Sequence, residues 1–242
     1  MKVKLNRQQF VESLLNPASK IADNLQLHFV NENGTQFCKT TTNSNDNSVI
    51  FLSKIPCIFD QEFSAIIPEC KTFLRLFANV DQEEITLELN VNSIVYQTPS
   101  FSFKYHLLDE SYIVNKKTIS EAKLNDLTFD TTFRAAKQKI NDIVKYNSII
   151  PEAEKVYFFT NDAGEVCAKV GDRERANINE IVFSMAPTFV GSTLSLDFPL
   201  NVQNILLFSF AQNEVEISVN QQLKVFKFET IHSKYIISGL IK

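Results

Sequence analysis

Several residue types are scarce in this chain. Its 242 residues include only five glycines, no tryptophan and three histidines, which are scattered singly as His28, His106 and His232. A chain so poor in glycine has no Gly-rich phosphate loop and no GxSxG nucleophile elbow, and its histidines form no HExxH motif. These absences predict a protein that is not an enzyme, with no catalytic residues, no metal site and no cofactor.

Cysteine is also sparse. The four cysteines, Cys38, Cys57, Cys70 and Cys167, form no CxxC pair. This favours buried free thiols in a reducing compartment over a zinc site or a disulfide framework. The charged cluster at 172–175 admits two interpretations, an acid/base site or a solvated hairpin loop, and its position between two strand-like runs favours the loop.

Long apolar runs are missing as well. No window approaches the roughly 18 apolar residues of a membrane-spanning helix, and residues 1–7 lack the apolar run of a signal peptide. We therefore expect a cytoplasmic protein that is neither secreted nor bound to a membrane. The net charge of -4 and pI near 5.5 argue against a protein that coats nucleic acid with its whole surface, but they allow a local basic face.

The longest stretch with a helical period runs from 129 to 147. Apolar residues recur on one stripe, with Arg134 and Lys145 roughly opposite and Lys137 and Lys139 flanking it. Asp130 is a suitable N-capping residue for this helix. The pattern predicts a helix with a basic face, which is also typical of an ordinary solvated amphipathic helix. The stripe consists of Phe133, Ala136, Ile140, Ile143 and Val144.

The first half of the chain reads as a helix followed by antiparallel strands. Apolar residues at helical spacing predict a helix over 6–16, which Pro17 should end. Pro68 is expected to open a second, short helix over 69–79. Turn-rich breaks separate the strands, which we expect at 25–30, 36–41, 49–52, 62–67, 85–91, 93–97 and 101–107.

The second half repeats this order after a connector at 109–126. Pro199 precedes a short helix expected at 200–210, as Pro68 precedes the one in the first half. The expected strands lie at 155–160, 165–170, 177–185, 193–197, 214–219, 223–228 and 233–240.

Two similar domains explain this repetition better than a chance likeness of two α+β stretches. The best match offsets the halves by about 130 residues, which is too long for a solenoid repeat. The predicted fold class is α+β, with two helices packed on antiparallel β-sheet in each domain. Domain 1 is expected at 1–110, an interdomain linker at 111–126 and domain 2 at 127–242.

This plan resembles DNA sliding clamps, in particular the trimeric clamps of bacteriophages and proliferating cell nuclear antigen. The likeness rests on the duplicated architecture, the basic helix that opens the second half, the linker, and the ending from His232 to Ile241. Members of that family are rings that encircle duplex DNA and tether a DNA polymerase without base-specific contacts. The resemblance therefore implies a homotrimer that binds double-stranded DNA, a DNA polymerase and a clamp loader, in the host cytoplasm if the protein is phage-encoded.

The resemblance also implies which residues face DNA. A sliding ring needs cations that meet phosphates without reading bases. Each candidate cation is equally compatible with solvated surface charge, and the helix near 200–210 carries no cation, so the lining would be unevenly basic. The candidates are Arg7, Lys71, Arg75, Arg134, Lys137, Lys139 and Lys145.

Two further surfaces follow from the resemblance by position. A pocket for partner peptides would be bordered by Tyr112, Ile113, Val114, Ile237, Leu240 and Ile241, although Ile237 is at least as suited to core packing. Subunits would join by pairing the strand at 101–107 with the strand at 177–185 of a neighbour. That interface would contain Phe101, Phe103, Tyr105, Ile178, Ile181 and Phe183. The competing hypothesis is a structural β-rich virion or scaffold protein with no DNA role.

Overall fold

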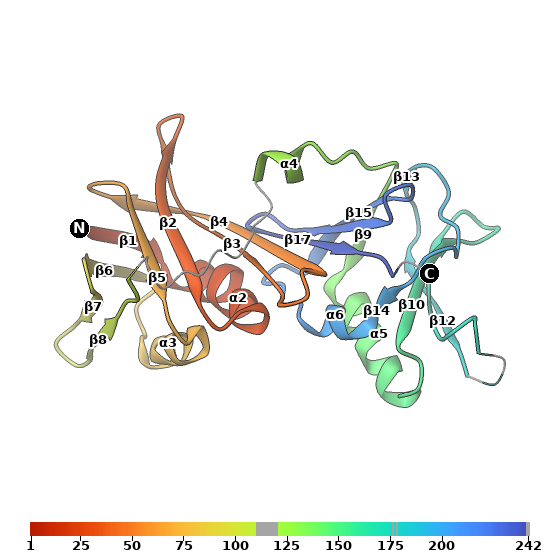
Figure 1. The fold of residues 1–242 in the computed structure, drawn as a ribbon, viewed down its shortest axis with the longest axis horizontal. Coiled ribbons are helices and arrows are strands. Elements are labelled where there is room, and N and C mark those ends of the chain that lie inside the picture. Colours follow the sequence, from red (N-terminus) through yellow and green to blue (C-terminus); the bar gives the residue numbers. More distant parts are fainter. Residues whose placement is uncertain (110–120, 176, 178, 241–242) are drawn as a thin grey trace. The chain divides into compact units, whose positions relative to one another are not determined.

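The chain divides into two compact units, Met1–Ile119 and Ser120–Lys242 (Figure 1). The computed structural model describes residues 1–109, 121–175, 177 and 179–240. The division falls within the stretch predicted as a linker, where α4 (Glu121–Asn125) forms a short helix. None of the helices in the described part of the chain is both long and apolar enough to span a membrane.

Unit 1 is built on an antiparallel sheet. Its strands follow the order β5-β2-β3-β4-β1-β6-β7-β8. Apolar and polar residues alternate along them, so that Ile85, Leu87 and Leu89 of one strand are buried while the residues between are exposed. The bounds are β1 (Lys2–Asn6), β2 (Leu25–Glu32), β3 (Thr35–Asn43), β4 (Val49–Phe59), β5 (Phe63–Ile67), β6 (Glu84–Asn90), β7 (Ser93–Gln97) and β8 (Ser102–His106). The predicted strands are therefore confirmed, although the one expected at 49–52 continues to Phe59, and β1 is an additional one.

The first helical stretch does not end at Pro17. It consists of α1 (Arg7–Gln9), a π-helical turn η1 (Phe10–Leu15) and α2 (Asn16–Ile21). The Asn16 amide donates to the Val11 carbonyl, five residues back. This wide turn places Pro17 in the first turn of α2, where no backbone N–H is needed. The prediction that proline ends the helix is wrong for that reason.

The second helix of unit 1 forms where it was predicted. It comprises α3 (Cys70–Leu76) and the 3-10 turn η2 (Phe77–Asn79). Helix α3 contacts α2, and both lie on the same side of the unit 1 strands (Figure 1). Phe10, Phe73 and Phe77 are at most 1% exposed, and the Phe10 and Phe77 rings meet edge to face at 5.5 Å between centroids.

Unit 2 contains two antiparallel sheets, with strand orders β13-β9-β15-β16-β17 and β12-β11-β10-β14. The ring of Phe158 lies 6.1 Å from that of Phe133 and 5.6 Å from that of Phe226, so aromatic packing joins the two sheets. Helices α5 (Lys137–Ile149) and α6 (Val202–Leu206) contact each other. The strands are β9 (Thr131–Ala136), β10 (Lys155–Thr160), β11 (Val166–Val170), β12 (Ile181–Ala186), β13 (Val190–Gly191), β14 (Leu200–Asn201), β15 (Glu214–Asn220), β16 (Val225–Glu229) and β17 (Ser233–Ser238).

The predicted helix over 129–147 begins only at Lys137. Its first part forms β9, in which Thr131, Phe133 and Ala135 are buried in strand alternation. Antiparallel pairing with β15 satisfies the backbone N–H and C=O groups of this segment, with Phe133 opposite Ile217. Asp130 is therefore not a helix cap. Its carboxylate accepts hydrogen bonds from Gln221 instead, including one of 3.0 Å from the backbone amide.

Three other predictions for unit 2 are corrected. The strand expected at 177–185 begins only at Ile181. The segment 193–197 is not a strand: the Thr160 amide donates to the Leu194 carbonyl at 3.0 Å, but the Leu194 amide donates to the Thr160 hydroxyl, so no ladder forms. The neighbouring Val190–Gly191 pairs with β9 in its place. Gly191 has φ +101°, and a Cβ there would lie 2.0 Å from the Asp130 carbonyl oxygen, so only glycine fits this approach. The helix expected at 200–210 is shortened to α6, preceded by β14.

The two units share the order of helices and strands that the sequence predicted. Each unit also has a short strand directly before a helical stretch, β1 before α1 and β9 before α5. The Arg7 amide donates to the Glu83 carbonyl at 2.7 Å, and the Lys137 amide donates to the Asn213 carbonyl at 2.7 Å. Both donors and both acceptors are 130 positions apart, as 137 is from 7 and 213 is from 83. The same hydrogen bond therefore fixes the strand-to-helix junction in both units.

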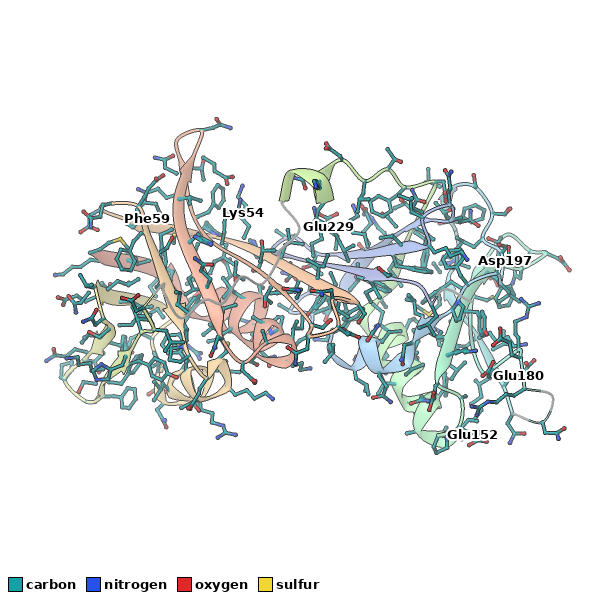
Figure 2. The ribbon with its side chains drawn as sticks, viewed as in Figure 1. Lys54, Phe59, Glu152, Glu180, Asp197 and Glu229 are labelled. Carbon is teal, nitrogen blue, oxygen red and sulfur yellow. The ribbon has the colours of Figure 1, made fainter. Side chains whose placement is uncertain are left out.

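Glu32 holds together two lysines that face each other across β3 and β4. Lys39 and Lys54 are register partners, and the Glu32 carboxylate forms an ion pair with each, at 2.8 Å to Lys39 (Figure 2 labels Lys54). Hydrogen bonds from Lys39 and Lys54 lower the pKa of Glu32. The carboxylate thus offsets the repulsion between like charges placed opposite each other.

Replacing Glu32 with glutamine is expected to lower the free energy of unfolding at pH 7 by up to about 1 kcal/mol, since the pairs are partly exposed. Because the pKa is lowered in the folded state, this stabilisation is present above the unfolded pKa and is lost as pH falls through the folded pKa. Urea denaturation of both proteins at pH 7 and near pH 3 measures the difference. A difference that persists unchanged at the lower pH would contradict an ionic cause.

Candidate nucleic-acid interface

Helix α3 presents two cations on its outer face. Phe73 is buried against the sheet, while Lys71 and Arg75, four positions apart, are exposed. The helix contains no acidic residue between Cys70 and Leu76. The cationic face of α3 therefore follows directly from the helical spacing in the sequence.

Helix α5 carries the largest group of helix cations. Ile140 and Ile143 are buried, Lys145 is exposed on the opposite face, and Lys137 and Lys139 are half-buried on the two flanks. These positions match the predicted helical wheel over the part of the segment that is helical. Lys137 and Lys139 lie in the first turn, at the positive end of the helix dipole, where cations are unfavourable by about 0.3–1 kcal/mol each.

Arg134 does not belong to this helical face. It lies on β9, and its guanidinium forms ion pairs with Glu216 at 3.3 Å and Glu214 at 3.8 Å on the adjacent strand β15. The assignment of Arg134 to a helical basic face is therefore wrong, because the residue is part of a strand. Its charge is already paired within the sheet.

The described cations separate into a paired and an unpaired set. Within the 4.0 Å limit for an ion pair, Lys71, Arg75, Lys137, Lys139 and Lys145 have no carboxylate partner among the described residues. Most strand cations do have one, and Lys2 and Lys104 are the exceptions. The paired strand cations are Lys4, Lys39, Lys54, Arg134, Lys155, Lys169, Lys227 and Lys234.

The charge on the strands is thus largely neutralised within the protein, whereas the charge on α3 and α5 is not. An unpaired lysine or arginine keeps its full attraction for an external anion, because no internal carboxylate competes for it. Surface ion pairs contribute little to stability. The division into paired strand cations and unpaired helix cations therefore matters mainly for the electrostatic potential outside the protein. The outer faces of α3 and α5 are the parts of each unit best suited to meet phosphates.

Two residues of the first helical stretch behave differently from each other. Arg7 is half-buried, and its Nε atom is enclosed without a hydrogen-bond partner in the described part of the chain. This enclosure favours a packing role. Lys20, in the last turn of α2, is exposed and was missed because the helix was expected to end at Pro17. The apolar spacing from Leu14 to Ala18 and Ile21 was the signal that the helix continues.

Four of the residues predicted for a subunit interface lie on two edge strands, Phe103 and Tyr105 on β8 and Ile181 and Phe183 on β12. β8 pairs only with β7 and β12 only with β11 among the described strands. Their apolar side chains, however, pack inside their own units. Tyr105 lies 4.9 Å from the Phe73 ring and donates a 2.6 Å hydrogen bond to the Pro68 carbonyl, and Phe103 lies 5.7 Å from Phe77.

The same arrangement recurs in unit 2. The Phe183 ring of β12 meets the Tyr146 ring of α5 at 4.8 Å. In each unit an aromatic contact thus joins the edge strand to a helix that carries unpaired cations. Ile181 is half-buried on the same strand. Phe101, just before β8, has its ring centroid 6.3 Å from that of Tyr96, with the two rings tilted, and Ile178 lies outside the described residues.

The residues predicted for a peptide pocket are only partly described. Tyr112, Ile113, Val114 and Ile241 lie outside the described residues. Ile237 on β17 is 0% exposed, so of its two possible roles the structure shows core packing. Leu240 is half-buried, and its amide donates to the Pro199 carbonyl at 2.8 Å.

The cysteines and the charged cluster at 172–175 are held within the fold by burial or ion pairing. All four cysteines are buried and free, and burial raises the pKa of Cys57 and of Cys70 to about 12, so these thiols are poor nucleophiles. In the described ranges no cluster of three or more His, Cys, Asp or Glu side chains is placed to hold a metal ion. Asp172 lies in the β11–β12 hairpin loop, where it pairs with Lys155 at 3.1 Å.

Comparisons with known proteins identify solved structures that share this fold. No family model and no curated protein sequence matches the chain. Among solved structures, A. fulgidus PCNA bound to the C-terminal region of FEN-1 is similar over 100% of this chain and 98% of that one, with 14% identity and a TM-score of 0.75. A chain of the Sulfolobus tokodaii PCNA2–PCNA3 complex is similar over 99% of both chains, with 13% identity and a TM-score of 0.70.

Bacterial clamps show the same likeness over part of their length. The DNA polymerase sliding clamp of Bacillus subtilis matches 100% of this chain, with 12% identity and a TM-score of 0.73, and the chain spans 64% of it. At identities this low the likeness concerns the fold. The chain thus has the two-domain α+β fold of the DNA sliding clamps.

Proposed function

We propose that this protein is a DNA sliding clamp, a non-enzymatic ring that encircles duplex DNA and raises the processivity of a DNA polymerase. The observation that carries the proposal is the set of unpaired cations on α3 and α5, on a fold shared with clamps. Cations that meet phosphates without reading bases permit sliding. The paired strand cations would keep the remaining surface from binding DNA non-specifically.

The proposed assembly is a homotrimer closed by the edge strands β8 and β12. Backbone pairing between these edges would bury N–H and C=O groups that otherwise invite aggregation. Because Phe103, Tyr105 and Phe183 pack inward, the backbone would provide most of this contact. The proposed partners are a DNA polymerase and a clamp loader, which would engage a site near residues 112–114, Leu240 and Ile241, in a cytoplasmic setting. We also propose that the protein is related to the trimeric clamps of bacteriophages.

Threading onto DNA ends tests encirclement without any loader. The protein is incubated with linear duplex DNA that has one end fixed to a bead, and the free end is blocked with a bulky protein either before or after incubation. A ring is retained through a high-salt wash only when the end is blocked afterwards, because high salt removes phosphate contacts but not topological linkage. Light scattering on the same sample measures the mass of the assembly.

Two outcomes would count against the proposal. Retention that does not depend on the order of blocking would indicate surface binding without encirclement. A monomer with no DNA association would support the alternative, a structural β-rich virion or scaffold protein.

A further inference from the structure

Helix α6 occupies in unit 2 the place that α3 occupies in unit 1. The Cys70 amide at the start of α3 donates to the Asp23 carbonyl at 2.6 Å, just before β2. The Val202 amide at the start of α6 donates to the Glu154 carbonyl at 3.0 Å, just before β10. The two helices are therefore fixed to equivalent points of their units by the same backbone hydrogen bond.

This equivalence sets the residues of the two helices in register. Aligning Cys70 with Val202 places Phe73 on Ile205, and all four side chains are at most 2% exposed. The same alignment places Lys71 on Gln203, and both residues are exposed. Gln203 therefore stands where unit 1 has an unpaired cation.

The outer face of α6 is otherwise uncharged. The helix contains no basic or acidic residue, and Leu206 is 42% exposed. The Asn201 side chain caps the helix by accepting a 2.8 Å hydrogen bond from the Gln203 amide, so the short helix is anchored at its start. The backbone of Gln203 is thus fixed at the start of the helix, and its exposed side chain is neutral where that of Lys71 is charged.

We infer that position 203 is an unused phosphate-contact position, and that its neutral glutamine limits the affinity of the protein for duplex DNA. The inference rests on the proposed function, because it assumes that the outer face of α3 meets DNA. Each added phosphate contact makes the slope of log affinity against log salt more negative by about 0.9. The absent charge at position 203 leaves binding weaker and movement along the duplex freer.

Exchanging the residues between the two helices tests the inference. The variants Lys71→Gln, Gln203→Lys and the double exchange K71Q/Q203K are compared by fluorescence anisotropy on a labelled duplex across a salt series. Q203K is expected to raise affinity by about tenfold near 50 mM salt, K71Q to lower it by a similar factor, and the double exchange to restore wild-type affinity.

A charge-matched control is K71Q/Q222K, which restores the same net charge on the exposed residue Gln222 in the turn between β15 and β16. It is expected to remain as weak as K71Q. If K71Q weakens binding but Q203K neither strengthens nor rescues it, the inference is overturned while the proposed function stands. If K71Q itself leaves binding unchanged, the DNA-facing role of α3 fails.

Discussion

Replacing Lys137, Lys139 and Lys145 together with alanine is expected to weaken duplex DNA binding on the order of 100-fold at low salt. The three residues have no ion-pair partner among the described residues, so no internal carboxylate competes with DNA phosphates for their charge. The loss should be similar for all DNA sequences, and the salt slope should fall by about 0.9 for each phosphate contact removed. Salt titrations of the variant and wild type on several duplexes measure both quantities.

Unfolding should not account for this loss. Lys137 and Lys139 oppose the dipole of α5, so their removal costs little helix stability or increases it slightly. The matched control is the triple alanine variant of Lys2, Lys123 and Lys224, which changes the net charge equally through residues that belong to neither α3 nor α5. Equal weakening by both triple variants would show that net charge alone matters, and would contradict a DNA-facing role for α5.

Replacing Phe73 with alanine is expected to lower the free energy of unfolding of unit 1 by about 3–5 kcal/mol. Phe73 is fully buried, and its ring contacts those of Phe77, Phe103 and Tyr105 at 5.2, 6.3 and 4.9 Å. The cavity would remove the contact that joins α3 to the edge strand β8. Such a loss is a large share of the 5–15 kcal/mol typical of a folded protein.

Hydrogen exchange locates the effect of this substitution. Amides of α3 and β8 should lose protection, whereas those of β10 in unit 2 should not. The milder Phe73→Leu variant keeps most of the buried volume and is expected to cost less than about 1.5 kcal/mol. Unchanged protection of β8 in the alanine variant would contradict the role of the aromatic cluster in holding the edge strand.

The start of the long helix in unit 2 was predicted too early. β9 precedes α5 without a turn residue to mark the boundary. In the second half, Phe133 and Ala136 fit both a helical stripe and a strand, and only pairing with β15 decides between them. That pairing joins segments about 80 residues apart, which local periodicity does not report.

Helical spacing likewise predicted the surroundings of some candidate DNA-facing residues and not of others. Lys71, Arg75 and Lys145 were assigned to exposed helix faces by spacing alone, and the structure places them there. Arg134 was assigned to the same kind of face and lies on a strand, paired with Glu216. A lysine or arginine can lie on either element, so its spacing identified neither the partner nor the surface.

The sequence by itself determined the α+β class, the duplication with its offset near 130, and the helical faces that carry Lys71, Arg75 and Lys145. These features depend on local period and composition, which short segments express without help from distant ones. The tertiary structure decided which cations are neutralised, which strands lie at edges, and that Gln203 stands at the position of Lys71. These properties depend on hydrogen bonds and ion pairs between segments far apart in the chain, such as Cys70 to Asp23 and Val202 to Glu154, and only the folded chain brings those groups together.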